Sequence, residues 1–345
     1  MRVIHLMSTD DYSGAENVAI SIVKGLNDKE IETFYATQKG IIDEFLKERN
    51  VENVIHINGL TVNEIKRIER EYNPDIIHAH DYRASVLAAI ACKKAKLISH
   101  IHNNASWIKN IFHPYSWAFL LASYRFSKIL IVSDSIEKEY VFSNCLKCEV
   151  VNVGNPVSRK DILEKVNKNY SKEYDICCVG RLTEAKNPQR FINIIKEIKE
   201  KKPNIKAIWV GDGELREKVE KIVKKENLVE NIKFIGFQEN PYVYMAQSRM
   251  FMLTSKWEGF GLVVYEALTL GLPSIVSNVG GLPSIVDDTC GKLCYKEDDF
   301  KEESIRLLND EEMYSLKSNN AVEKSKKLDN SKEYINKIEN LYENI

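Results

Sequence analysis

Two acidic side chains flank a glycine-rich turn in an otherwise apolar segment in the second half of the chain. Glu258 and Glu266 lie eight positions apart, on either side of the Gly-Phe-Gly segment 259–261. Glu266 is the one charged residue between Gly259 and Pro273, so its burial would require a hydrogen-bonding partner or access to water. A solvated stripe on an otherwise packed helix would also account for Glu266 taken alone.

Two cations stand five positions apart in the segment "VGRLTEAKNPQRF", which follows an apolar run. Arg181 and Lys186 occupy a turn that ends at Asn187-Pro188, a pair typical of a helix start. Such a loop suits a diphosphate, because a guanidinium donates two parallel hydrogen bonds and an ammonium supplies a point charge. A solvated loop is the alternative interpretation.

Glycines follow two other strand-like runs. Gly14 in "SGAEN" stands at an expected helix start, where backbone N–H groups and the helix dipole favour an anion. By itself this is weak evidence, because the same residues also suit an ordinary helix start. Gly211 in "VGDGEL" provides a second turn, and the neighbouring Asp212 could cap the next helix or contact a ligand. The chain has neither a G-x-G-x-x-G nor a G-x-x-x-x-G-K-[ST] segment, so dinucleotide-dehydrogenase and P-loop interpretations lose their main support.

All seven histidines precede residue 114, and four of them form two H-x-H pairs at the ends of apolar runs. His100 and His102 close "SHIH", whereas His78 and His80 close "IIHAH". The ends of such runs are where ligand sites are built in α/β proteins. A structural role fits His78 equally well, and we expect its side chain to point away from that of His80.

The elements that position these residues are alternating strand-like and helix-like runs, which predict parallel sheets covered on both faces. The first half contains the strand-like runs "RVIHLM", "TFYAT", "NVIHI", "DIIHAH", "LISHIH", "ILIVS" and "EVVNV". The second half contains "YDICCVG", "KAIWVG", "IKFIG", "MFMLTS" and "PSIVS". We therefore expect an α/β protein with two doubly wound, Rossmann-like domains, comprising residues 1–155 and 156–330, followed by an amphipathic helix at 331–345.

The bulk properties narrow the class of protein further. A length of 345 residues suits two domains, and 49 basic against 50 acidic residues argue against a nucleic-acid binder. Seven scattered cysteines indicate a reducing compartment, and the one CxxC pair, Cys145 and Cys148, has no partners that would complete a zinc site. Without a signal peptide or a spanning apolar run, we expect a cytoplasmic protein, or one bound peripherally to the inner face of a membrane.

The segments "GRLTEAKN", "VGDGEL", "IGF" and "EGFGLVVYEALTLGLPSIVSNVGGLPSIV", after an N-terminal "SGAE", resemble the retaining, nucleotide-sugar-dependent glycosyltransferases of family 4. The resemblance implies the GT-B fold, in which two Rossmann-like domains face each other across a cleft and the C-terminal helix returns to the N-terminal domain. Glu258 and Glu266 fill the E-x7-E signature of that family. The chain departs from the family at Ser13, where a second glycine is common, and at Ser284, where a glutamate is common.

The resemblance also implies a role for each candidate residue. Glu258, Arg181, Lys186 and His102 would be catalytic: the two cations would hold the donor diphosphate, Glu258 would contact the transferred sugar, and His102 would face it. Glu266 would bind the ribose, and the segment 235–240 would read the base. The other donor-binding candidates are Gly14, Gly211, Phe260 and Gly261.

The activity so implied is transfer of a hexose or N-acetylhexosamine from a nucleotide diphosphate sugar, of the UDP type, to a saccharide or lipid-linked saccharide acceptor. No cofactor and no metal is expected, because cations at the phosphates would stabilise the leaving group and no D-x-D follows a strand. The adjacent pairs Asp10-Asp11 and Asp298-Asp299 are interpreted as loop residues. The alternatives to a glycosyltransferase are an epimerase or phosphorylase on the same architecture and a non-catalytic partner subunit.

A segment rich in aromatic and basic residues, Trp107 to Phe126, has two interpretations. It could form an interfacial helix that leans on a membrane or holds a lipid-linked acceptor. Packing of its rings against the sheet of the N-terminal domain is the favoured alternative. The residues His78, His80 and Asp81 could line the acceptor side.

Overall fold

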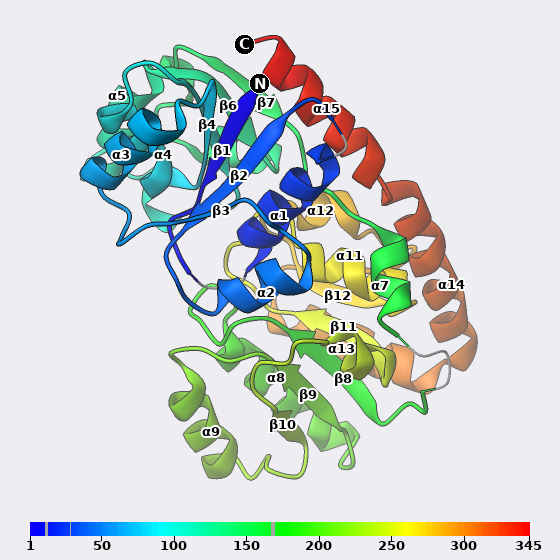
Figure 1. Cartoon of the computed structure of the whole chain (residues 1–345). Helices are drawn as coiled ribbons and strands as arrows, with labels where there is room; N and C mark the ends of the chain where they lie inside the picture. Colours follow the sequence, from blue (N-terminus) through cyan, green and yellow to red (C-terminus); the bar gives the residue numbers. More distant parts are fainter. Residues whose placement is uncertain (11–12, 28, 167–169) are drawn as a thin grey trace. The chain divides into compact units, whose positions relative to one another are not determined.

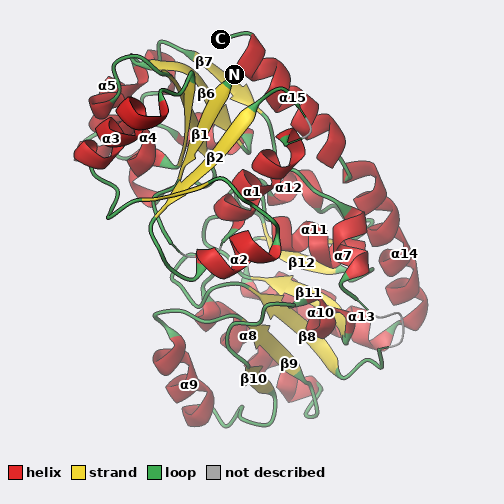
Figure 2. Ribbon diagram, in the orientation of Figure 1, coloured by secondary structure: helices red, strands yellow, loops and turns green. Residues whose placement is uncertain are grey.

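The alternation of strand and helix patterns produces two parallel β-sheets flanked by helices (Figures 1 and 2). The computed structural model describes residues 1–10, 13–27, 29–166 and 170–345. These residues divide into two units: unit 1 is Met1–Pro156 with Asn330–Ile345, and unit 2 is Val157–Asp329.

Unit 1 contains a seven-stranded parallel sheet in the order β3-β2-β1-β4-β5-β6-β7. The strands are β1 (Arg2–Leu6), β2 (Glu32–Thr37), β3 (Val54–His56), β4 (Ile76–His80), β5 (Lys96–Ile101), β6 (Phe126–Ile131) and β7 (Glu149–Asn152). The helices are α1 (Gly14–Leu26), α2 (Ile42–Glu48), α3 (Val62–Tyr72), α4 (Tyr82–Ala91), α5 (Pro114–Ser123), α6 (Asp134–Glu139) and α15 (Ser331–Glu343), with short 3₁₀ turns at Ser106–Lys109 and Ser143–Cys145.

Unit 2 contains a six-stranded parallel sheet in the order β10-β9-β8-β11-β12-β13. The strands are β8 (Tyr174–Val179), β9 (Ala207–Val210), β10 (Ile232–Phe234), β11 (Ser248–Leu253), β12 (Ser274–Ser277) and β13 (Gly291–Cys294). The helices are α7 (Arg159–Glu164), α8 (Pro188–Lys201), α9 (Arg216–Lys225), α10 (Tyr242–Ala246), α11 (Leu262–Thr269), α12 (Leu282–Ile285), α13 (Glu297–Asn309) and α14 (Glu311–Leu328).

The predicted α/β class with two doubly wound halves is confirmed, and each strand-like run in the sequence forms a strand. The strand that sequence reasoning missed is β13, whose four residues "GKLC" contain a glycine and a lysine. A run of four residues with a glycine and a lysine carries no clear strand signal, and its extended form depends on pairing with β12.

The helix α15 belongs to unit 1, although the chain reaches it after leaving unit 2. Its apolar face buries Tyr334, Ile335, Ile338 and Tyr342. Ile335 lies against Gly25 of α1, and Glu339 forms an ion pair with Lys29 at 3.0 Å. The spacing of apolar residues in the tail therefore produces the expected amphipathic helix, which contacts the N-terminal unit.

Each sheet reverses its strand order at one point, between β1 and β4 in unit 1 and between β8 and β11 in unit 2. In doubly wound sheets ligands bind at the carboxyl ends of the strands beside such a reversal point, so the loops after these strands are where a site is expected. No helix within the described ranges is long and apolar enough to cross a bilayer.

Candidate active site

The reversal point of the unit 2 sheet brings a lysine and a glutamate together from loops far apart in the sequence. Lys186 lies in the loop after β8, and Glu258 lies in the loop after β11. The Lys186 Nζ and the Glu258 Oε2 are 2.5 Å apart, and the side chains are 20% and 14% exposed. The Ser255 hydroxyl donates a second hydrogen bond to the same carboxylate oxygen at 3.1 Å. This cation and this acid therefore form one partly buried ion pair.

Backbone contacts fasten the two loops to each other. The Thr254 hydroxyl donates to the carbonyl oxygens of Lys186 and Asn187, at 3.1 and 3.2 Å. The Lys256 N–H donates to the Ala185 carbonyl at 2.8 Å. Because these bonds join the end of β11 to the turn before α8, the lysine and the glutamate are held at a set spacing.

Arg181 lies in the same loop as Lys186, and its side chain is exposed. Across residues 1–10, 13–27, 29–166 and 170–345, no side chain or carbonyl forms a hydrogen bond or ion pair with its guanidinium. A guanidinium without a protein partner remains available to a ligand that carries a planar pair of oxygens.

Unused backbone donors lie beside the ion pair, at the start of α11. Gly261 is the N-cap residue of this helix, with φ of +92°. Among the described residues, no acceptor takes the N–H groups of Phe260, Gly261 or Leu262. The first N–H groups of a helix have no intrahelical partner and favour a negatively charged ligand. The ring of Phe260 is half-buried against the core of unit 2.

Glu266 lies on α11, one turn after these N–H groups, and is half-buried. Its Oε1 accepts a hydrogen bond from the Tyr242 hydroxyl at 3.2 Å. The sequence predicted that this carboxylate needs a partner but did not identify Tyr242. The signal was the position of Tyr242 two residues after the segment 235–240, which the family resemblance assigned to the base.

Gly280 and Gly281 support the loop that contains Glu258, a role that sequence reasoning missed. The Gly281 N–H donates to the Gly259 carbonyl at 2.6 Å. Gly280 has φ of +56°, and an added Cβ would overlap the Glu258 carbonyl oxygen. The available signal was the paired glycine itself, because paired glycines mark a close approach of two backbone segments. The hydroxyl of Ser284, where the family often has glutamate, donates to the Gly281 carbonyl at 2.6 Å.

Gly211 lies where the loop after β9 passes the loop after β8. An added Cβ would overlap the Gly180 carbonyl, and the Gly211 N–H already donates to the Gly236 carbonyl at 2.8 Å. Gly211 therefore positions the two loops, and its amide has a protein acceptor. Asp212 does not cap α9 but forms an ion pair with Arg216 at 2.7 Å.

The two candidates of unit 1 lie at the carboxyl edge of its sheet. Gly14 is the first residue of α1 and is exposed. The neighbouring Ser13 makes no side-chain cap and donates instead to Glu16 Oε2 at 2.5 Å. His102 follows β5, and its Nε2 is 2.9 Å from His80 Nδ1. Burial lowers the pKa of His102 to about 3, so this imidazole is neutral near pH 7.

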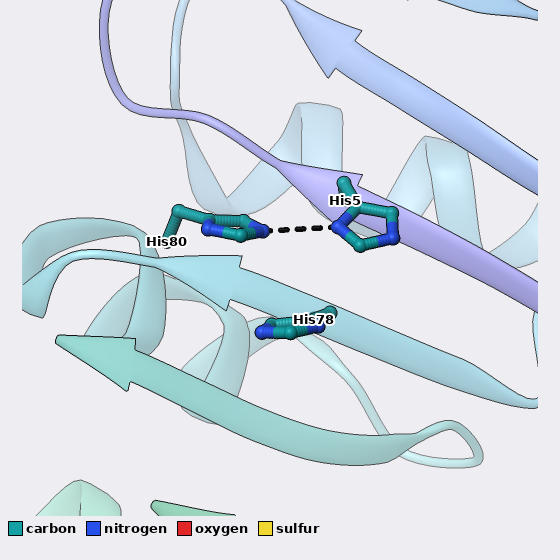
Figure 3. Close-up of side chains that lie close together, drawn as sticks. All are labelled: His5, His78 and His80. Carbon is teal, nitrogen blue, oxygen red and sulfur yellow. Dashed lines mark hydrogen bonds between the residues drawn. The ribbon is translucent and has the colours of Figure 1, made fainter. Parts of the chain in front are cut away.

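The prediction that His78 points away from His80 is wrong. Their ring centroids are 4.5 Å apart with planes 13° from parallel, and Figure 3 shows both rings on one side of β4. The reason is the two-residue period of a strand, which places residues i and i+2 on the same face. The next residue, Asp81, accepts the Ala84 N–H at 2.9 Å and caps α4.

The interpretation of Asp298-Asp299 as loop residues is also wrong. Both lie in the first turn of α13, where Asp299 accepts the N–H groups of Tyr295 and Lys296, and Asp298 pairs with Lys301 at 2.6 Å. Acids at this position are stabilised by the helix dipole. In the other pair, Asp11 lies outside the described residues.

The aromatic segment packs less completely than expected. Of its seven rings, Phe119 and Phe126 are buried and Trp107 is half-buried. The remaining four are exposed, namely Phe112 (91%), Tyr115, Trp117 and Tyr124. The favoured alternative, packing of these rings against the sheet, is therefore wrong for the four exposed rings.

Comparisons with known proteins identify the family to which this chain belongs. Residues 159–327 match the family model described as glycosyl transferases group 1, and residues 12–157 match the model of glycosyltransferase family 4. An uncharacterized glycosyltransferase of Methanocaldococcus jannaschii is 30% identical over 271 residues, which span 76% of this chain and 73% of the relative. The chain belongs to the family 4 glycosyltransferases, and the predicted family and enzyme class are confirmed.

Two further proteins are similar over most of their length. The UDP-Gal:alpha-D-GlcNAc-diphosphoundecaprenol alpha-1,3-galactosyltransferase of Escherichia coli is 24% identical over 290 residues, 78% of this chain and 75% of the relative. The crystal structure of Anabaena HepE in complex with UDP-glucose has a TM-score of 0.84 at 19% identity, and the match covers 100% of both chains. The fold is that of GT-B glycosyltransferases.

Proposed function

We propose that this glycosyltransferase moves a hexose or N-acetylhexosamine from a UDP-sugar to a saccharide or lipid-linked saccharide, with retention of anomeric configuration. One observation carries the donor assignment: three features share one sheet edge. They are the Lys186–Glu258 pair, the Arg181 guanidinium and the N–H groups at the start of α11, of which the last two have no partner among the described residues. Two names support the substrate class. The name of the E. coli relative specifies UDP-Gal and a diphosphoundecaprenol acceptor, and that of the HepE complex specifies UDP-glucose.

The chemistry requires groups that stabilise a departing nucleoside diphosphate. As the bond from the anomeric carbon to phosphate breaks, negative charge grows on the phosphate oxygens. Fixed cations and amides aimed at those oxygens lower the barrier more than they stabilise the bound donor. Arg181, Lys186 and the N–H groups of Phe260 and Gly261 supply such donors. In this proposal the protein's own cations neutralise the leaving group, so neither a metal nor another cofactor is needed.

The two acids would bind the polyol parts of the donor. Without a ligand, Glu258 is neutralised by Lys186 and Glu266 accepts from Tyr242. When phosphate attracts the ammonium of Lys186, the Glu258 carboxylate requires new donors, which sugar hydroxyls can provide. Ribose hydroxyls would serve Glu266 in the same way. In unit 1, Gly14 and His102 are the proposed donor contacts.

Replacement of Glu266 by glutamine should weaken UDP binding about tenfold, because hydrogen bonds to a charged acceptor contribute about 1.5–3 kcal/mol. Isothermal titration with UDP measures the change. Glu323→Gln is the matched control, since Glu323 is an exposed acid of α14 in the same unit, paired with Lys326 at 2.6 Å. Equal affinities for the two variants would remove Glu266 from the nucleotide site.

The reaction class is tested by incubating the protein with a panel of nucleotide sugars and saccharide acceptors and detecting products by mass. Acceptor-dependent transfer from one UDP-sugar is expected, with the same rate in the presence of a chelator. Conversion of the donor without an acceptor would indicate an epimerase, and consumption of inorganic phosphate would indicate a phosphorylase. The anomeric configuration of the product tests retention.

An exposed apolar stripe on α5 favours a lipid surface or a lipid-linked acceptor near unit 1. Trp117 and Leu121 of α5 and its C-cap residue Tyr124 are spaced i, i+4, i+7, and they are 47%, 67% and 61% exposed. Phe112, just before the helix, is 91% exposed. A helix of a water-soluble domain normally buries such a stripe, and exposed aromatic residues are typical of membrane interfaces.

The double variant Phe112→Ser, Leu121→Ser is expected to reduce binding to vesicles of phosphatidylethanolamine and phosphatidylglycerol at least about tenfold, because two apolar side chains no longer enter the interface. Co-sedimentation measures the bound fraction. The matched control is Val229→Ser, Tyr295→Ser, which alters two exposed apolar residues of unit 2. If the wild-type protein and both double variants bind vesicles equally, the stripe is not a membrane surface.

A further inference from the structure

Five imidazoles and one phenol form a continuous hydrogen-bonded chain in the core of unit 1. In order they are His102, His80, His5, Tyr342, His78 and His100. The links are His102 Nε2 to His80 Nδ1 at 2.9 Å, His80 Nε2 to His5 Nδ1 at 3.0 Å, His5 Nε2 to the Tyr342 hydroxyl at 3.5 Å, that hydroxyl to His78 Nδ1 at 2.6 Å, and His78 Nε2 to His100 Nδ1 at 3.1 Å. Figure 3 shows three of these rings, from β1 and β4.

The number of hydrogens matches a chain of neutral groups. A neutral imidazole has one N–H and one lone pair, and a phenol has one O–H, so six groups carry six hydrogens for five links. One hydrogen must therefore remain unused at one end, and one lone pair must remain unused at the other. The ring nitrogens without a partner among the described residues are His102 Nδ1 and His100 Nε2, which are the two ends.

Burial keeps these rings neutral. It lowers the pKa of His5 and of His102 to about 3, and it lowers the pKa of the other three imidazoles well below the usual value. Desolvation disfavours the imidazolium form. An imidazolium has two N–H donors and no acceptor, so it would interrupt the alternation of donors and acceptors along the hydrogen-bonded chain.

The phenol determines the direction of the chain. A phenol O–H is a better donor than a neutral imidazole N–H, and an imidazole lone pair is a better acceptor than a phenol oxygen. The short 2.6 Å link is therefore the one in which Tyr342 donates, to His78 Nδ1. Its oxygen can then only accept from His5 Nε2–H. Each later link follows: His80 Nε2–H donates to His5 Nδ1, and His102 Nε2–H donates to His80 Nδ1.

We propose that this chain holds His102 as the Nε2–H tautomer, so that Nδ1 keeps a lone pair and accepts a hydrogen bond from a substrate hydroxyl. Tyr342, on the C-terminal helix, is then a positioning residue for His102. The tautomer follows from unit 1 alone, whereas its use on a substrate hydroxyl rests on the proposed function. A base or acceptor at this position would orient a sugar or acceptor hydroxyl and could receive its proton.

Two other arrangements of the same residues compete with this one. The opposite direction would give the buried His100 Nε2 a lone pair rather than an unpaired N–H, but the phenol would then accept across 2.6 Å and donate across 3.5 Å. The second competing arrangement is a bound divalent cation. Two sets of histidines each bring three ligand atoms within 4.8 Å of one another, namely His5, His78 and His80, and His80, His100 and His102. A cation would consume the lone pairs that the links use and would lie buried without a carboxylate among these ligands.

The experiment is nitrogen NMR of the full-length protein labelled with ¹⁵N-histidine, recorded without donor, with His102 assigned from the His102→Asn spectrum. The expected result is a neutral His102 protonated at Nε2. Protonation at Nδ1 would overturn the direction of the chain. Elemental analysis of the purified protein that shows one equivalent of bound zinc, nickel or copper would overturn the chain itself.

Tyr342→Phe tests the positioning role. Without the phenol, His102 should populate both tautomers, kcat should fall about tenfold, the equivalent of one hydrogen bond, and the donor KM should stay within about twofold. Tyr334→Phe is the matched control, since Tyr334 is a buried tyrosine of the same helix whose hydroxyl has no partner among the described residues. An unchanged His102 tautomer in Tyr342→Phe would overturn the role of Tyr342. Failure of the protein to bind UDP would instead refute the proposed function and leave the tautomer result standing.

Discussion

Arg181→Ala is expected to lower kcat/KM for the UDP-sugar by about 10²–10³, the largest effect of any single side chain in the candidate site. The guanidinium has no hydrogen-bonding partner within the described part of the chain, so its removal should leave the fold of unit 2 intact. The loss should appear mostly in kcat, because charge on the diphosphate oxygens grows as the glycosidic bond breaks.

The measurement is steady-state kinetics on purified protein, together with thermal unfolding to confirm that stability is unchanged. Arg306→Ala is the matched control, because Arg306 is an exposed arginine of unit 2 whose one ion-pair contact within the described residues is Glu303 at 4.0 Å. Arg181→Lys should restore part of the rate, since it keeps the charge but loses the two-pronged geometry. A rate for Arg181→Ala within a factor of about three of the Arg306→Ala rate would remove Arg181 from the proposed diphosphate site.

Gly280→Ala is expected to abolish measurable transfer and to destabilise unit 2 by more than about 2 kcal/mol. The new methyl group would overlap the Glu258 carbonyl oxygen, and the residue would also be held at φ of +56°. Relief of this overlap requires the loop with Glu258 to move away, which breaks the 2.5 Å pair with Lys186. Denaturant unfolding and transfer assays measure the two effects.

Gly154→Ala separates the effect of the atomic overlap from the effect of the positive φ. Gly154 has a similar φ of +67°, but an added Cβ would have no atom within 4 Å. We therefore expect it to show only the conformational cost of about 1 kcal/mol, with activity retained. Equal losses of stability and activity in the two variants would mean that close packing at Gly280 does not support the site.

The side chains of the candidate site could be located from the sequence because each follows a strand-like run. Arg181 and Lys186 come after "YDICCV", and Glu258 comes after "MFML", so a parallel sheet places all three at its carboxyl edge. The two-residue and 3.6-residue periods of apolar side chains are local properties, which is why the doubly wound class could be predicted. The same rule of period two, applied correctly to His78 and His80, would have placed their rings together.

The partners of those side chains could not be predicted, since a partner is chosen by packing between segments far apart in the chain. Nothing near Glu258 in the sequence indicates that its cation is Lys186, or that Gly280 must lack a side chain to let its loop approach. Tyr242 beside Glu266 and Tyr342 beside His78 are further examples. Each such contact depends on where whole strands and helices come to lie.

The amino-acid sequence alone determined the class of fold, the family, the runs that form the strands other than β13, and the loops in which charged residues stand. Local periodicity and motif spacing suffice for these, because they act over a few residues at a time. The tertiary structure decided the ion pair of Lys186 and Glu258, the pairing of β13, and the chain of neutral histidines that ends at His102. These features depend on distances between residues that only the folded chain brings together, where burial changes both their charge and their partners.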